Sequence, residues 1–143
     1  MAGNLGQVLL AVAVCPHPPM IVPEVAAGAA DDLAELRQAC DDAVAVLVAC
    51  GPDRVVVVGT GDLAGDRDEA AGGTLARFGV DVRAGGPNDE LPLSLTIGAW
   101  LLDRAGWPGP RTYSTGEPDT TGKVALLVMA DGSAPRTDRK RAA

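Results

Sequence analysis

The fold is decided by an apolar run near the start of the sequence, Val8-Leu-Leu-Ala-Val-Ala-Val14. Two further runs of this kind follow at Val55-Val-Val-Val58 and Val124-Ala-Leu-Leu-Val-Met129. None of them alternates apolar with polar residues, as a strand with one face in water does, and the Val-rich middle run is a poor helix former. The runs therefore predict strands buried on both faces. They favour a three-layer α/β sandwich, with a mostly parallel or mixed central sheet flanked by helices.

A helix is predicted between the first two runs. Asp32 and Glu35 have the spacing of a capping box at its start, and Gly51-Pro52 is typical of a helix end. The order strand, helix, strand is that of the right-handed crossover unit in α/β folds. One apolar stripe along this helix is formed by Leu33, Leu36, Cys40, Ala43, Val44 and Leu47.

A second helix is expected from near Pro92 to Gly106. We expect the Gly-rich and Asp-rich residues 64–90 to be mostly loop, with a short strand at 78–82, and residues 112–114 to form an edge strand. One face of the second helix carries Leu93, Ile97, Trp100 and Leu101.

Length and composition limit the classes of function. A chain of 143 residues with 47% apolar residues predicts one domain, residues 1–135, followed by a basic tail, 136–143, that we expect to be solvated and mobile. The formal net charge of −7 argues against nucleic acid or an anionic membrane as partner, because both attract cationic proteins. No stretch approaches the ~20 apolar residues of a membrane helix.

The cysteines indicate the compartment. Cys15, Cys40 and Cys50 are odd in number and form no CxxC pair. This usage fits a reducing environment better than a secreted disulfide framework, so we expect a cytoplasmic protein.

Polar residues follow each of the three apolar runs. His17 comes after the first, Asp62 after the second, and Asp131 and Ser133 after the third. Because ligands of α/β sheets bind beyond the carboxyl ends of the strands, these residues form a candidate ligand cleft if the strands run parallel. The alternative is structural: His17 would hydrogen-bond a loop, and the two aspartates would serve turns or helix caps.

His17 is the candidate metal ligand. It is the only histidine and stands between prolines that restrict the backbone on both sides. A single histidine leaves too few ligands for an ordinary metalloenzyme within one chain.

A dinucleotide site is a further alternative. Gly59-Thr-Gly-Asp-Leu-Ala64 fits the GxGxxA pattern, with Asp81 downstream. That fingerprint requires a helix directly after it, and Gly65, Gly72 and Gly73 make such a helix poor.

Several segments resemble a known family in their order along the chain. The stretch Cys15-Pro-His-Pro-Pro-Met-Ile-Val-Pro-Glu24 and the later Pro52-Asp-Arg-Val-Val-Val-Val-Gly59 resemble the opening of class III extradiol ring-opening dioxygenases of the LigB type. Leu91-Pro-Leu-Ser-Leu-Thr-Ile-Gly-Ala-Trp100 and Leu126-Leu-Val-Met-Ala-Asp-Gly-Ser133 are similar to a shortened branch of that superfamily. The resemblance spans about residues 7 to 137.

The resemblance implies chemistry that the sequence retains only in part. Family members cleave catechol-type rings with Fe(II) held by two histidines and a glutamate, and a further histidine acts as acid and base. His17 matches the first iron ligand, whereas Gly59-Thr-Gly-Asp62 stands where the second histidine is expected. The glutamate and the acid/base histidine have no counterpart, so one of four functional positions is present.

The leading hypothesis is accordingly a degenerate LigB-like domain for ligand binding or assembly, with no cofactor. The rival is an active Fe(II) extradiol dioxygenase, and a nucleotide-binding module is the third reading. Since a shortened family fold would leave apolar surface uncovered, we expect a homo-oligomer or a second protein chain as partner. A small aromatic compound is the ligand class that the resemblance implies.

Overall fold

The computed structural model describes residues 7–130, so the predicted tail at 136–143 lies outside the described residues. No helix within 7–130 combines the length and the apolar character needed to cross a membrane. The main elements are β1 (Gln7–Pro16), α1 (Pro23–Ala26), α2 (Ala34–Ala49), β2 (Arg54–Val58), β3 (Ala71–Thr74), β4 (Arg83–Gly85), β5 (Asn88–Asp89), α3 (Leu93–Ala105), β6 (Arg111–Ser114) and β7 (Gly122–Ala130).

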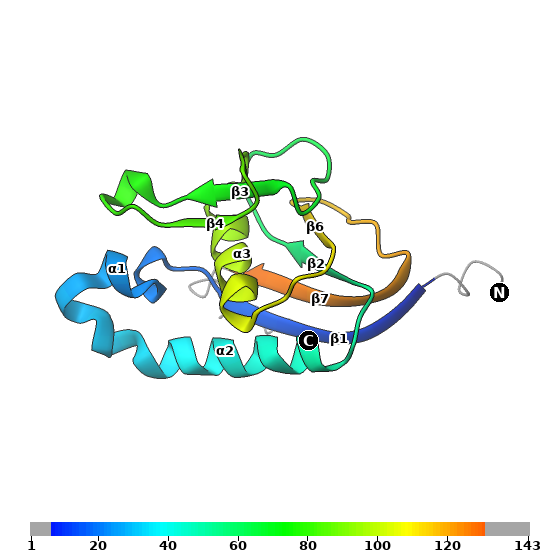
Figure 1. Cartoon of the computed structure of the whole chain (residues 1–143), viewed down its shortest axis with the longest axis horizontal. Helices are drawn as coiled ribbons and strands as arrows, with labels where there is room; N and C mark the ends of the chain where they lie inside the picture. Colours follow the sequence, from blue (N-terminus) through cyan, green and yellow to red (C-terminus); the bar gives the residue numbers. More distant parts are fainter. Residues whose placement is uncertain (1–6, 131–143) are drawn as a thin grey trace, which may run out of the picture.

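The three apolar runs form the strands β1, β2 and β7, as predicted. They lie in a four-stranded sheet of order β1-β7-β2-β6, in which every pairing is parallel. The chain leaves β1, crosses through α2 to β2, and later returns to place β7 between them (Figure 1). The predicted edge strand is also confirmed, since β6 forms one edge of this sheet. The protein is thus an α/β domain built on a parallel sheet.

Helix α2 confirms the predicted stripe except at Leu33, which precedes the helix, and it does not confirm the predicted cap. Cys40, Val44 and Leu47 are buried in the core, with Leu36 and Ala43 packed against it. The capping box is wrong, because a 3-10 helix over Ala27–Leu33 leads directly into α2 and no side chain caps its first turn. With the preceding residues already helical, the first amide groups of α2 do not start from an extended residue as a capping box requires.

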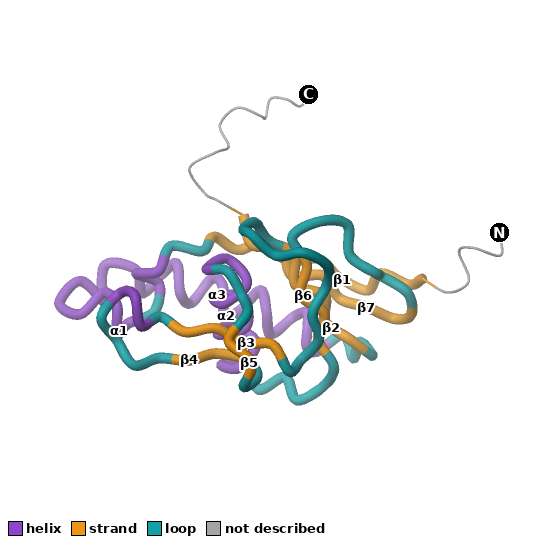
Figure 2. Tube along the Cα trace, turned by 90° about the horizontal axis from the view of Figure 1, so that it is seen from above, coloured by secondary structure: helices purple, strands orange, loops and turns teal. Residues whose placement is uncertain are grey.

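Helix α3 begins and ends close to the predicted positions. Gly106 ends it in a left-handed conformation, with φ of 75°, which glycine adopts without strain. The prediction of one apolar face was too narrow, because every residue from Ser94 to Leu102 is buried. Figure 2 shows the reason: α3 runs between the four-stranded sheet and a smaller sheet of order β4-β3-β5.

The smaller sheet was not predicted from the sequence. Residues 64–90 contain β3, β4 and β5 where loop was expected, and 79–82, within the expected strand, are not in a strand. Ala-Gly-Gly-Thr has little strand propensity of its own. Packing explains the result, because a Cβ on Gly73 would collide with the Thr96 side chain. The glycine therefore allows β3 to approach α3 closely.

The two faces of the four-stranded sheet differ. Val57 and Met129 face α3, since a Cβ on Gly98 of that helix would meet both side chains. The opposite face has no covering helix among residues 7–130, so burial on both faces is wrong for β1. Val12 is 51% exposed and Val14 64% exposed. The second helical layer of a three-layer sandwich is not found within the described residues.

Candidate functional site

A polar cavity lies beyond the carboxyl ends of β1 and β2. Its volume is about 530 Å³, and His17 and Asp62 both line it. The structure thus brings two of the three residues that were predicted to converge, His17 and Asp62, to one cavity. Asp131 and Ser133 lie outside the described residues, although Ala130 pairs with Pro16 and thus ends β7 at the same edge.

His17 forms part of the cavity wall with an unpartnered imidazole nitrogen. Its Nε2 atom is buried and has no hydrogen-bond partner among the described residues. Buried polar atoms of native proteins are nearly always paired, so an unpaired one in a cavity wall is a candidate contact for a ligand or ordered water. The structural alternative, a histidine whose Nε2 hydrogen-bonds its own loop, is not what the geometry shows.

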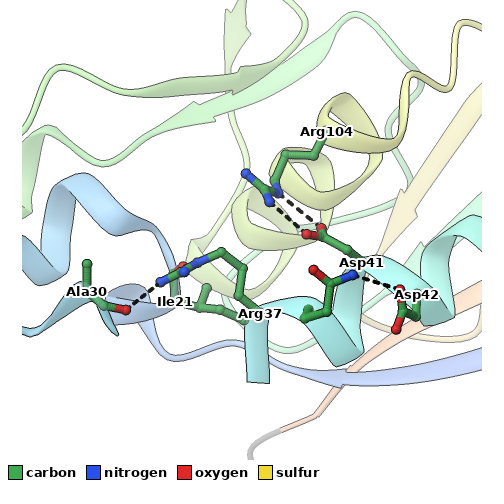
Figure 3. Close-up of polar contacts among 7 residues, drawn as sticks. Ile21, Ala30, Arg37, Asp41, Asp42 and Arg104 are labelled. Atoms are coloured by element: carbon green, nitrogen blue, oxygen red, sulfur yellow. Dashed lines mark hydrogen bonds and ion pairs between the residues drawn. The ribbon is translucent and has the colours of Figure 1, made fainter. Parts of the chain in front are cut away.

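The chain after His17 is fixed by an arginine from α2. Arg37 donates from Nε to the carbonyl of Ile21 at 2.8 Å and from Nη2 to the carbonyl of Ala30 at 3.1 Å (Figure 3). These contacts hold the segment that returns from the Pro-His-Pro-Pro motif to the helix. Together with the flanking prolines, they restrict the backbone that carries the imidazole.

The turn after β2 is clamped to the start of α3 by Ser94. The Ser94 hydroxyl donates to the Thr60 carbonyl at 2.6 Å and accepts from the Thr60 amide at 2.9 Å. This approach requires glycine at two positions. A Cβ on Gly59 would collide with Ser94, and Gly61 has φ of 137° with Pro92 against its open side. The clamp sets the position of Asp62 at the cavity rim.

Charged side chains at the rim were not predicted from the sequence. Arg77, Asp89 and Glu90 line the same cavity as His17. Glu90 already pairs with Arg67 at 2.7 Å, whereas Arg77 lies over the Phe78 ring at 5.1 Å from its centroid. They come from the small sheet and its loops, which the sequence did not reveal. The one available signal was the acidic pair directly before Leu91-Pro92, at the start of a predicted helix.

Residues 7–130 alone do not form the ferrous site that the resemblance implies. Within 7–130, no three His, Cys, Asp or Glu side chains are grouped so that they could hold a metal ion. A facial triad needs three ligands on one side of the iron. His17 and Asp62 supply at most two, and the rim carboxylates of Asp89 and Glu90 do not complete the set.

A pair of buried thiols lies beside the strand that leads to His17. Cys15 and Cys40 are 1% and 3% exposed, while Cys50 is exposed, and all three are free. The hydrogen bond with Cys40, and then burial, raise the pKa of the Cys15 thiol far above its ordinary value. Cys15 packs in the core, where buried thiols are poor nucleophiles.

The dinucleotide pattern lacks the helix it needs. Residues 59–70 contain no helical residue after Gly59-Thr-Gly61. The backbone amide groups that would meet a pyrophosphate are therefore not arrayed at a helix start. The glycines serve the close contacts with Ser94 and Pro92 instead.

No family model, curated protein or solved structure matches this chain. The resemblance to LigB-type dioxygenases thus stays a prediction from the sequence. The candidate site is defined by its geometry: one half-buried imidazole at the wall and charged groups of both signs at the rim.

Proposed function

We propose that this protein is a non-catalytic, LigB-like domain that binds a small polar ligand in the cavity beside His17. The observation that carries the proposal is the buried Nε2 atom without a partner, in the wall of a cavity of about 530 Å³. A ligand group that hydrogen-bonds this nitrogen would satisfy an otherwise unpaired polar atom, which is worth on the order of 1–3 kcal/mol.

The rim indicates the chemistry of the ligand. Arg77 provides a cation that forms no ion pair with a carboxylate of residues 7–130, and Asp62 and Asp89 provide acceptors. A small aromatic compound with adjacent hydroxyl groups combines donors for the carboxylates with a ring that the apolar wall at Leu91 and Leu93 can contact. This is also the ligand class that the resemblance implies.

Turnover is not part of the proposal. An extradiol dioxygenase needs a ferrous centre and an acid/base group, and the described donors do not complete such a site. The cytoplasm is the compartment that we propose, because three free thiols suit a reducing environment. Assembly with a second chain, in a LigB-like arrangement that covers the open sheet face, belongs to the same proposal.

The test uses the only histidine of the chain. In untagged protein, one imidazole gives one set of ring NMR signals, which report directly on the cavity. Titration with catechol should shift these signals, and Arg77→Gln should weaken the binding about tenfold. The matched control is Arg83→Gln, an exposed arginine of the same small sheet that does not line the cavity.

Two outcomes would contradict the proposal. If a high concentration of catechol does not shift these signals, small aromatic diols are excluded as the ligand class. Stoichiometric Fe(II) bound under anaerobic conditions and lost in His17→Ala, together with ring-cleavage absorbance from catechol, would establish the dioxygenase instead.

A further inference from the structure

The exposed part of the open sheet face is a continuous apolar patch centred on β1. Register places Leu9 beside Val124, Val12 beside Leu126 and Val14 beside Val128. Leu9, Val12 and Val14 are 55%, 51% and 64% exposed, while Leu126 and Val128 are half-buried. We call Leu9, Val12, Val14, Leu126 and Val128 the β1 patch.

The two edges of the sheet are protected very differently. At the β6 edge, Tyr113 and Arg67 exchange both backbone hydrogen bonds, at 2.8 and 2.9 Å. At the opposite edge, β1 pairs only with β7 among the described residues. Its stretch from Val8 to Cys15 contains no charge, glycine or proline, and its one irregularity is a register shift between Leu9 and Ala11. Natural edge strands usually carry such protection.

The flanking segments of the sequence are poorly suited to cover this patch. Residues 131–143 contain no large apolar side chain, and residues 1–6 contain only Met1 and Leu5. The patch itself carries no charged side chain, so a partner cannot be recognised there by charges of opposite sign. An uncharged patch is instead compatible with itself across a two-fold axis, where each side chain meets a copy of its neighbour.

We propose that a second copy of this chain docks along β1, so that the two β1 edges pair and the two β1 patches join. Pairing satisfies the free backbone groups of the edge. It also places the two β1 patches side by side on one face of the joined sheet, where cross-strand contacts between the copies cover part of the exposed valine surface. The proposal deepens the assembly part of the proposed function, and it does not depend on occupation of the His17 cavity.

The test is the mass of the full chain in solution as a function of concentration, measured by light scattering or sedimentation. We expect a species of twice 14.5 kDa that dissociates on dilution. Val12→Lys should raise its dissociation constant about 100-fold or more, because two like charges would meet in an apolar contact. The matched control is Val46→Lys on α2, which is 61% exposed and outside the β1 patch, and which should leave the constant unchanged.

Several results would overturn the proposal. One is a mass of 14.5 kDa at the highest soluble concentration, and another is a dimer that Val12→Lys leaves intact. If circular dichroism shows that Val12→Lys does not fold, hydrogen exchange of the wild-type protein tests the proposal instead. Protection of the β1 amides should rise with concentration, and protection that does not change while the mass doubles places the contact elsewhere.

The proposal of a ligand in the His17 cavity is tested independently of the proposed dimer. Catechol that shifts the imidazole signals of monomeric Val12→Lys as in the wild type shows that binding does not need the dimer. If the protein is a dimer and catechol does not shift its imidazole signals, only the cavity proposal is contradicted.

Discussion

The two faces of the parallel sheet carry similar residues and have different surroundings. On the covered face, Val57 and Leu127 are completely buried against the helices, whereas on the open face Val12 and Val14 are more than half exposed. The side chains on the two faces are mostly Val, Leu and Ala, so composition does not distinguish them. The contrast teaches that a continuous apolar run predicts a strand whose two faces can both be buried. The run does not predict whether the same chain or a second chain buries each face.

Two adjacent leucines of β7 give the largest expected difference between the faces. Leu127→Ala should lower the free energy of unfolding by about 2–5 kcal/mol, because it opens a cavity in the helix-covered core. Leu126→Ala, on the open face, should cost less than about 1.5 kcal/mol. Urea denaturation at one low protein concentration measures both. Equal losses would show that the open face is buried in the protein as it exists in solution.

Two arginines sharpen the comparison for polar groups. Arg111 on the covered face is 8% exposed and donates to the Tyr113 hydroxyl at 3.1 Å and to Asp103 at 2.9 Å. Arg111→Leu should cost about 2 kcal/mol, since it leaves the buried hydroxyl without its partner. Arg54 on the open face binds carbonyls that water can reach, so Arg54→Leu should cost about 1 kcal/mol. The same denaturation experiment compares them, and a larger loss for Arg54→Leu contradicts the prediction.

The only tyrosine extends the comparison to alkaline pH. Burial raises the pKa of Tyr113, although the neighbouring Arg111 opposes the shift. Because the folded pKa lies above the unfolded value, the neutral hydroxyl contributes stability that is present in full below about pH 10 and is lost as pH rises further. Absorbance at the phenolate band should show ionisation at higher pH in native protein than in urea. Identical titrations would place the ring in water, and Tyr113→Phe is the control.

The smallest effect is expected at the surface of the helical layer. Asp41 of α2 and Arg104 of α3 form two hydrogen bonds, at 2.7 and 3.0 Å (Figure 3). Arg104 also lies over the Trp100 ring. Because both side chains reach solvent, Asp41→Asn should cost less than about 1 kcal/mol, and salt should reduce the difference. Asp42→Asn is the control, since Asp42 pairs only with Gln38 of its own helix. A loss above 2 kcal/mol would mean that the pair, not burial, holds the helices together.

The sequence predicted the elements whose pattern is local. Three apolar runs, the α2 stripe and the Gly106 stop predicted β1, β2, β7, α2 and α3 and a parallel or mixed sheet, at whose edge His17 and Asp62 lie in one cavity. The small sheet was missed because β3 contains glycines with little strand propensity. Gly73 is needed there for the close contact with Thr96, which is far along the chain. Arg77 and Asp89 were missed with it, since their place in the site depends on that sheet. The uncovered face of β1 was missed because burial depends on neighbours that the run itself does not encode.

From Ser94 to Leu102, helix α3 has no side that faces water, since this part lies between the two sheets. Local opening of the small sheet would therefore bare a helix made of Leu, Ile, Trp and Ala, and the main sheet would lose its cover in the same event. The two sheets should accordingly melt as one cooperative unit. For protein engineering, an insertion or a new pair of termini is therefore better placed at the exposed turn around Gly116 than within the two sheets that pack on α3.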